Sequence, residues 1–419
     1  MPPRTRPPEE RKPGSAGANP SSMSNPLAFL DDELADLREQ GVYRWPRELQ
    51  GEQAPVCAYD GRRVINLCSN NYLGLASDPR LKAAARRAID EQGVGSGAVR
   101  TIAGNMAIHQ VLERRLAAFK RTEAALLYQS GFTANAGTVA AILGKEDVVV
   151  SDELNHASII DGCRLSGAER KIFPHKDVAA ARRLLEGSRN ARRVLLISDG
   201  VFSMDGDVAP LPELAALARE FGAIMMVDDA HASGVMGDGG RGTVEHFGLH
   251  GMVDIQVGTL SKAWACLGGY VAGSRRLVEF LMNRARPLLF STSHPPSVAA
   301  TAIAALDVIE EEPGLIARLW ENTRVFKVGL QRLGFDTGLS ETPITPIMVG
   351  DHALAMRFSD RLFEEGVFAL GIGFPTVPRG KARVRTIVTA GHTPDDLGKA
   401  LEILGRVGRE LGLIGQTRG

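Results

Sequence analysis

The chain has 419 residues, of which 44% are hydrophobic, so it is long enough for a large core and for two domains. Lys plus Arg and Asp plus Glu each number 49, and the resulting net charge of zero argues against a polyanionic partner such as nucleic acid. The four cysteines are far apart, which excludes a compact zinc site and indicates free thiols in a reducing cytosol.

The first segment, residues 1–26, is rich in Pro, Arg, Glu, Gly and Ser and contains no long apolar run. This composition fits neither a secretory signal nor a membrane span. We therefore expect a disordered tail on a cytoplasmic protein that has no membrane partner. Met23 is an alternative start of the chain.

Residues 27–70 are expected to form an N-terminal arm. Within it, Leu30, Leu34 and Leu37 recur at helical spacing and predict an amphipathic helix. The arm leads into residues 70–74, a polar stretch rich in turn residues.

The central part of the chain alternates between helical and strand-like patterns. Helices are predicted at 79–92 and 107–120, and from residue 124 onward strands and helices alternate. The clearest pair is an apolar run at 194–197 followed by a helical pattern at 211–221. The apolar runs are continuous, as strands buried on both faces of a parallel sheet require, so we predict an α/β domain.

The last third of the chain has a different pattern. From about residue 296 it changes to long helices with two strand candidates, at 344–349 and 384–388. We therefore predict a large domain at 71–296 and a smaller C-terminal domain at 297–419.

Polar residues follow most of the predicted strands of the large domain. In open α/β sheets the ligand lies beyond the carboxyl ends of the strands, so these residues are expected to converge on one cleft. They are Asp152, Asp199, Asp228, Asp229 and the segment Thr259–Lys262.

Lys262 is the first chemical candidate in this cleft. It follows the apolar run at 255–257, where its amine is well placed to form a Schiff base with a cofactor aldehyde. Most lysines, however, are solvated surface charges, so position alone does not make Lys262 reactive.

The neighbours of Lys262 fit the other parts of pyridoxal phosphate. Asp228, at a strand end, is a candidate partner for the ring nitrogen, and His231 is a candidate for the phenolic oxygen. The backbone N–H groups of Gly131 and Phe132, at a strand-to-helix junction, are candidates for the phosphate.

Each of these residues also has a purely structural explanation. An Asp pair after a strand is most often a turn or a helix cap. A histidine such as His156 is more often a satisfied polar residue, and Gly131 alone is a loop glycine. Only their joint order outweighs these explanations.

Five motifs stand in order along the chain: SNNYLGL at 69–75, DxxNHASIIDG at 152–162, DGVFSMDGD at 199–207, VDDAH at 227–231 and TLSK at 259–262. Together they resemble the α-oxoamine synthase family, pyridoxal-phosphate acyltransferases that join an amino acid to an acyl-CoA. The resemblance runs from about residue 28 to 414. It implies a fold-type I, aspartate aminotransferase-like α/β fold, in which a large domain with a mostly parallel seven-stranded sheet is joined to a smaller α+β C-terminal domain.

The resemblance implies two catalytic residues, Lys262 and His156. Lys262 would form the Schiff base with pyridoxal phosphate and remove the Cα proton of the amino acid, while His156 would stack on the cofactor ring. Asp228 would hold the ring nitrogen, and Ser203 and His231 would bind the phenolic oxygen.

Phosphate binding is also implied by the resemblance. Thr259 would bind the phosphate together with the amides of Gly131 and Phe132. Ser291 and Thr292 would reach the phosphate of a neighbouring subunit, which implies a homodimer with shared active sites.

Three residues are expected to bind substrate. Asn70 and Arg385 would hold the carboxylate, a task that suits a bidentate guanidinium, and Thr376 is a further candidate. Family members commonly carry a Gly-Gly pair soon after the lysine, where this chain has the segment 264–266. The bulk of Trp264 is therefore expected to narrow the acyl channel.

The implied reaction condenses an amino acid with an acyl-CoA to a 2-amino-3-oxo acid and releases CoA. The segments 95–101, which contains Arg100, and 286–291 favour glycine C-acetyltransferase, which acts on glycine and acetyl-CoA or on 2-amino-3-ketobutyrate in reverse. The segments 291–293 and 374–378 also suit 8-amino-7-oxononanoate synthase, which joins L-alanine to a pimeloyl thioester in biotin synthesis. We favour the first activity and keep the second, or a broad-specificity enzyme, as the alternative.

Two remote rivals remain. Gly93-x-Gly95-x-x-Ala98 fits the degenerate fingerprint of a Rossmann dehydrogenase, but it follows a helical pattern where the fingerprint requires a strand. A non-catalytic subunit of the same fold would lose the Schiff-base lysine, whereas this chain keeps Lys262.

Overall fold

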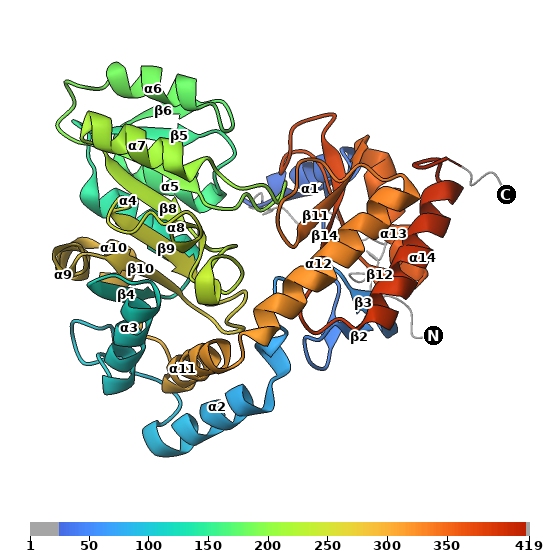
Figure 1. The fold of residues 1–419 in the computed structure, drawn as a ribbon, viewed down its shortest axis with the longest axis horizontal. Helices are drawn as coiled ribbons and strands as arrows, with labels where there is room; N and C mark the ends of the chain where they lie inside the picture. The colour runs from blue at the N-terminus through green and yellow to red at the C-terminus, as the bar shows by residue number, and fades with distance from the viewer. Residues whose placement is uncertain (1–24, 416–419) are drawn as a thin grey trace, which may run out of the picture.

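The computed structural model describes residues 25–415, which fold into a large α/β half and a smaller half rich in helices (Figure 1). The predicted disordered tail lies, apart from its last two residues, outside the described residues. None of the described helices is long and apolar enough to cross a membrane.

The large half is built on a seven-stranded sheet, as predicted, with the strand order β4-β10-β9-β8-β7-β5-β6. Neighbouring strands from β6 to β9 pair in parallel, and β10 pairs antiparallel with both β9 and β4. The strands are β4 (Ala124–Tyr128), β5 (Val148–Asp152), β6 (Glu169–Phe173), β7 (Val194–Asp199), β8 (Ile224–Asp228), β9 (Ile255–Thr259) and β10 (Gly269–Gly273).

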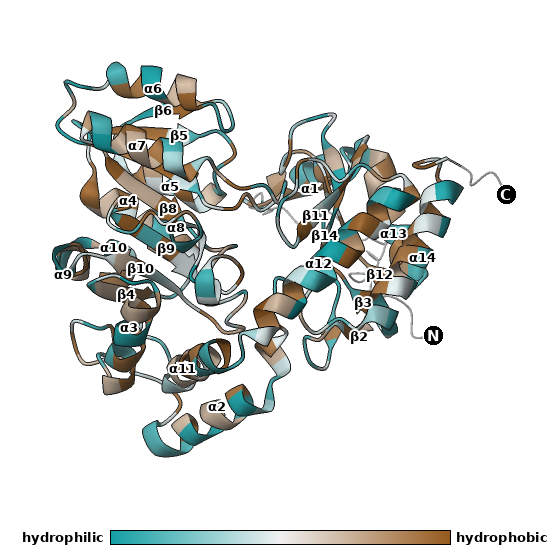
Figure 2. Ribbon diagram, viewed as in Figure 1, coloured by the Kyte–Doolittle hydropathy of each residue, from teal (hydrophilic) through white to brown (hydrophobic). Residues whose placement is uncertain are grey.

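Helices cover both faces of this sheet, which explains the continuous apolar runs. Val149 and Met226 belong to the buried cluster on the face of α4 and α5, whereas Val150 and Met225 belong to the cluster on the face of α6 and α7. Figure 2 shows the strands mainly in brown between helices that also carry teal. The covering helices are α4 (Gly131–Ile142), α5 (Ala157–Ser166), α6 (Val178–Glu186), α7 (Leu211–Phe221), α8 (Thr243–His246), α9 (Arg275–Arg284) and α10 (Arg286–Leu289).

Three further helices, α2 (Pro79–Gln92), α3 (Ala107–Phe119) and α11 (Pro296–Glu311), pack together beside β4 (Figure 1). Asp78 caps α2 by accepting a hydrogen bond from the Arg80 amide. Both helices predicted in this part of the chain are confirmed.

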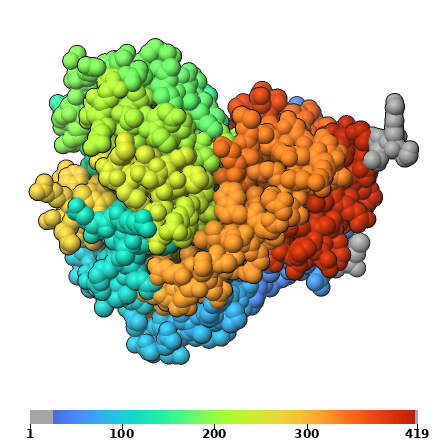
Figure 3. Space-filling model, viewed as in Figure 1, coloured from blue at the N-terminus to red at the C-terminus, as the bar shows by residue number. Residues whose placement is uncertain are grey.

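The smaller half contains a three-stranded antiparallel sheet in the order β11-β14-β13. Both strands predicted here are confirmed. The elements are α12 (Gly314–Leu333), β11 (Ile344–Gly350), α13 (His352–Glu364), β13 (Leu370–Ile372), β14 (Ala382–Ile387) and α14 (Pro394–Glu410). Figure 3 shows this half in contact with the large half.

The N-terminal arm is joined to the smaller half. Its strands β1 (Leu49–Gln50), β2 (Val56–Tyr59) and β3 (Arg62–Asn66) form a sheet with β12 (Val367–Phe368), which pairs in parallel with β3. The predicted amphipathic helix is α1 (Phe29–Glu39), none of whose residues is buried. The expected domain boundaries stay a prediction.

Candidate active site

Several of the predicted site residues lie at one edge of the large sheet. Asp199 ends β7 and Asp228 ends β8, and the two stand opposite each other in the register of these parallel strands. Thr259 ends β9, the next strand. The convergence expected from the strand-end pattern is therefore confirmed for these three residues.

The amine of Lys262 lies free beside these carboxylates. Among the described residues, its Nζ makes no hydrogen bond and no ion pair. Burial lowers the pKa of Lys262 to about 8, the Asp228 carboxylate opposes this change, and the Arg385 guanidinium adds to it. The site therefore holds a larger fraction of neutral, nucleophilic amine at neutral pH than a surface lysine would.

The carboxylate of Asp228 is held from two sides. Asn135 Nδ2, in α4, donates to Oδ2 over 2.6 Å, and the Ala230 amide donates to Oδ1 over 2.8 Å. Asp228 is 5% exposed, so these bonds fix a buried anion at the end of its strand. Asn135 had no signal in the sequence, because the contact joins residues 93 positions apart.

His156 presents an accessible ring in the same region. It is the N-cap of α5, and its Nδ1 lies 2.7 Å from Ser158 Oγ. Partial burial lowers the pKa of His156, with Asp228 opposing and Lys262 adding to this effect, which favours a neutral imidazole. A neutral ring with an open face can stack on a planar ligand.

The end of β9 and the start of α4 form a candidate phosphate cradle. A Cβ added to Gly131 would lie only 3.2 Å from the Thr259 Cβ, so the two segments touch. Ser130 caps α4, and Thr259 Oγ1 lies 2.7 Å from the hydroxyl of Ser261, a residue of the TLSK motif that was given no role of its own. The first amides of α4, including that of the partly exposed Phe132, suit an anion.

Arg385 and Asn70 meet, as predicted for a carboxylate site. Arg385 Nη2 donates to Asn70 Oδ1 over 3.2 Å. Arg385 Nε is buried and has no hydrogen-bond partner among the described residues, and burial lowers the pKa of this guanidinium. An incompletely paired buried cation favours an anionic ligand.

His231 is buried and neutral. Burial lowers its pKa well below the usual value, and Lys262 and Arg385 add to the effect. Its Nδ1 lies 2.7 Å from the hydroxyl of Tyr72, a residue that lies in the SNNYLGL motif but was given no role of its own.

Four predicted site residues make no side-chain hydrogen bond to this cluster within the described part of the chain. Ser203 is half-buried in the loop after β7, and Ser291 is half-buried after α10. Thr292 and Thr376 are exposed. Their assigned roles stay predictions.

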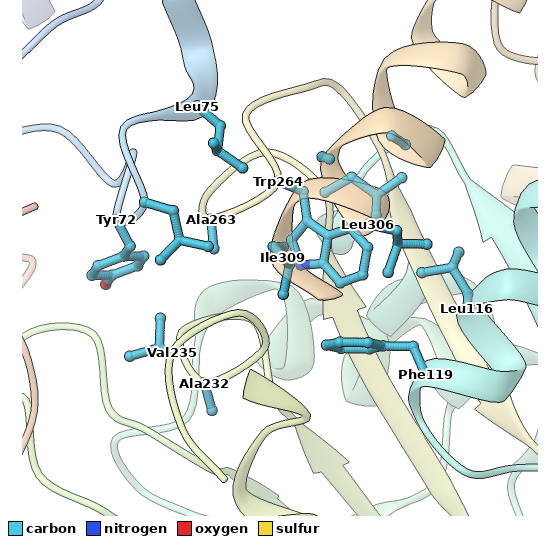
Figure 4. Close-up of a cluster of buried hydrophobic side chains, with 14 of the residues drawn as sticks. Tyr72, Leu75, Leu116, Phe119, Ala232, Val235, Ala263, Trp264, Leu306 and Ile309 are labelled. Carbon is cyan, nitrogen blue, oxygen red and sulfur yellow. The ribbon is translucent and has the colours of Figure 1, made fainter. Parts of the chain in front are cut away.

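The expectation for Trp264 is wrong. Its side chain is fully buried and packs edge-on against Phe119, with ring centroids 5.0 Å apart, within the core shown in Figure 4. It therefore points into the protein and does not narrow a channel beside Lys262. Gly268 and Gly269 supply a glycine pair six residues after the lysine.

The chain is similar to known proteins along nearly its whole length. The family described as Aminotransferase class I and II matches residues 62–404. The 8-amino-7-oxononanoate synthase of Symbiobacterium thermophilum is 61% identical over 92% of this chain and 99% of its own length. The 8-amino-7-oxononanoate synthase 1 of Bacillus subtilis is 53% identical over 94% of this chain and 100% of its own length.

A solved lysine-to-alanine variant of the serine palmitoyltransferase from S. paucimobilis, with a bound PLP–myriocin aldimine, superposes with a TM-score of 0.88 at 32% identity, covering 93% of this chain and 98% of that one. The chain belongs to the α-oxoamine synthase family. It has the fold-type I architecture, and it is a pyridoxal-phosphate-dependent, acyl-transferring enzyme.

The residues present fit this cofactor. A free amine, a fixed buried carboxylate, an open imidazole face and a capped helix N-terminus lie together, as an aldehyde, a ring nitrogen, a planar ring and a phosphate require. In this enzyme we assign these tasks to Lys262, Asp228, His156 and the segment beginning at Gly131, as proposals.

Proposed function

We propose that this α-oxoamine synthase is an 8-amino-7-oxononanoate synthase, which condenses L-alanine with a pimeloyl thioester and releases CO2 and the thiol. The observation that carries this proposal is the 61% identity to a protein of that name along nearly the whole chain. The preference for glycine and acetyl-CoA is corrected accordingly, because the relatives support the alternative activity.

A contact within the structure explains why that preference failed. Arg100, in one of the segments that favoured the glycine-using branch, forms a buried ion pair with Glu113 over 2.8 Å. Its Nε also donates to Asn105 over 2.8 Å. These contacts account for Arg100 as a structural residue without reference to the substrate.

The chain's own residues suggest how the reaction is performed. When bound, pyridoxal phosphate supplies an electron sink for charge at the substrate Cα. Arg385 and Asn70 hold the alanine carboxylate, and Lys262 Nζ, with its lowered pKa, takes the Cα proton. Asp228 keeps the ring nitrogen protonated, which the Asn135 hydrogen bond supports by fixing the carboxylate.

We also propose a homodimer with shared active sites, in which Ser291 and Thr292 reach the phosphate of the neighbouring subunit. The neighbouring Phe290 is 71% exposed and Ile102 is 81% exposed, so apolar surface is available for a partner. We expect Thr292→Arg to lower the dimer fraction, measured by light scattering, and also the affinity for the cofactor, measured in a binding assay.

The acyl and amino specificity is tested by measuring CoA thiol release over a matrix of substrates. Glycine, L-alanine and L-serine are each combined with acetyl-, succinyl- and pimeloyl-CoA. The proposal predicts that L-alanine with pimeloyl-CoA gives the highest kcat/KM. A higher kcat/KM for glycine with acetyl-CoA would contradict the proposal and support glycine C-acetyltransferase activity instead.

A further inference from the structure

The Tyr72 hydroxyl is committed to one partner. It lies 2.7 Å from His231 Nδ1, and among the described residues it makes no other hydrogen bond. Tyr72 is 1% exposed and His231 is 8% exposed, so water competes little for this contact. The two rings meet edge-on at an interplanar angle of 82°.

The direction of this hydrogen bond follows from the inventory of donors and acceptors. If Nδ1 carried the proton and donated it, the Tyr72 hydroxyl hydrogen would be left without an acceptor in a buried place. If the hydroxyl donates, both groups are satisfied. Burial raises the pKa of Tyr72 and lowers that of His231, so the pair consists of a protonated phenol and a neutral imidazole.

A neutral imidazole that accepts at Nδ1 carries its proton on Nε2. Nε2 makes no hydrogen bond to any described residue, which leaves this N–H available as a donor to a ligand. A donor is what the anionic phenolic oxygen of pyridoxal phosphate needs.

Tyr72 itself is anchored by the other half of the molecule. The amide of Ala390, beyond β14, donates to the Tyr72 carbonyl over 2.7 Å. Two residues before Tyr72, Asn70 binds Arg385 of β14. Figure 4 shows Tyr72 at the edge of the buried cluster that also contains Ala263, the neighbour of Lys262.

We propose that Tyr72 is a positioning residue that fixes His231 in the tautomer with Nε2 protonated and so makes it a hydrogen-bond donor to the cofactor. This inference rests on the role of His231 in the proposed function. Because the SNNYLGL segment carries both Asn70 and Tyr72, it links the substrate carboxylate site to the cofactor site.

Nitrogen NMR of the apoenzyme, labelled with ¹⁵N in its histidines, tests the proposal. The His231 signals are identified by their absence in His231→Gln. In the unmodified protein we expect a protonated Nε2 and an unprotonated Nδ1 whose shift is that of a hydrogen-bond acceptor. In Tyr72→Phe the Nδ1 shift moves to that of a free acceptor, and the population with Nδ1 protonated rises.

Tyr59→Phe is the matched control. Tyr59 is also buried, at 9% exposed, but its hydroxyl binds Gln53. We expect this variant to leave the His231 signals unchanged. In the holoenzyme, Tyr72→Phe weakens cofactor binding about tenfold, the scale of one lost hydrogen bond to a polar group, whereas Tyr59→Phe does not.

A protonated Nδ1 in the unmodified protein would overturn the proposal, even if Tyr72→Phe failed to fold. An Nδ1 shift that is the same in Tyr72→Phe would overturn it as well. Since the apoenzyme contains no substrate, these outcomes do not depend on which acyl donor the enzyme uses, and an error in the proposed acyl specificity would leave the spectra as expected.

Discussion

At the scale of single residues, the site changes the chemistry of a common side chain by its surroundings. Lys262 is one of ten lysines in the chain, yet burial lowers its pKa to about 8 even though Asp228 opposes this change. Another lysine, Lys327 in α12, also has its pKa lowered to about 8, but it is occupied by the carbonyls of Ser340 and Thr342. A lowered pKa alone therefore does not identify the reactive lysine. Lys262 differs from Lys327 because its amine also has no hydrogen-bond partner among the described residues.

Replacing this amine tests its role. We expect Lys262→Ala to lose the visible absorbance of the Schiff base and to lower kcat by about 10³-fold or more, because the variant lacks both the nucleophile and the base. Lys327→Ala is the matched control and keeps the absorbance. If the visible spectrum of Lys262→Ala equals that of the unmodified enzyme, the cofactor assignment is wrong.

The lowered pKa of Lys262 also predicts a pH dependence. Only the neutral amine attacks the cofactor aldehyde, so the rate at which apoenzyme recombines with pyridoxal phosphate rises as pH increases through about 8. Stopped-flow absorbance measures this rate. An inflection near 10.5, the ordinary value for lysine, would show that the protein does not desolvate the amine.

At the scale of elements, the site depends on the close approach of α4 to the end of β9. The first amides of α4 have no partner within the helix, and the small Gly131 lets them lie close to Thr259 at the end of β9. This explains why a glycine stands at the junction although its backbone does not require one.

Adding a methyl group at this junction tests the cradle. Gly131→Ala brings a Cβ within 3.2 Å of Thr259 and is expected to weaken pyridoxal phosphate binding about tenfold. Binding of pyridoxal, which lacks the phosphate, changes less. Gly398→Ala, at a helix position with open space around it, is the control in equilibrium dialysis. If Gly131→Ala weakened the binding of pyridoxal phosphate and of pyridoxal equally, the phosphate would not bind at this junction.

At the scale of the whole molecule, both halves hold the loop that carries Ser203. His175, after β6, bridges Asp152 of β5 and Asp207 of the loop over 3.1 and 2.9 Å. From the smaller half, Arg383 of β14 donates to the Met204 carbonyl over 3.0 Å. The two halves are therefore fixed relative to each other through this loop.

The His175 bridge predicts how stability changes with pH. Burial opposes protonation of His175, but the two aspartates outweigh it and raise its pKa to about 9 from 6.5. The bridge therefore stabilises the fold fully below pH 6.5 and loses its contribution as pH rises through about 9. At pH 7 the contribution is on the order of 2 kcal/mol.

Urea denaturation of the unmodified enzyme and of His175→Gln measures this contribution. The difference in unfolding free energy is expected to shrink between pH 7 and pH 10. A difference that grows or stays constant over this range would contradict the proposed charged state. Lys176 and Glu341 lie in the same cluster and are present in both proteins, so the difference between the two unfolding free energies reports on His175.

Helices and strands could be predicted from the sequence where neighbouring residues alone define them. The helix predicted at 211–221 has those bounds in the structure, because apolar spacing and a proline in the first turn define it locally. The contact of Asn135 with Asp228, and that of Tyr72 with His231, join residues 93 and 159 positions apart. No local pattern encodes such contacts, so Asn135 was missed.

The amino acid and acyl group that the enzyme uses could not be predicted from the sequence motifs either. The prediction that glycine is the substrate used a segment that contains Arg100, and this residue forms an ion pair with Glu113. Trp264 was expected to shape the acyl channel, but its place in the core depends on packing against Phe119. In both cases a distant partner decides what the side chain does.

The central claim, a decarboxylating condensation of L-alanine with a pimeloyl thioester, is tested most directly by following the substrate carbons. The enzyme is incubated with pimeloyl-CoA and L-alanine labelled with ¹³C in the carboxyl group, and CO2 and CoA are quantified together. We predict that labelled CO2 and CoA appear in equal amounts, and that Lys262→Ala releases neither. CoA release without labelled CO2, or no release from this pair of substrates, would contradict the account.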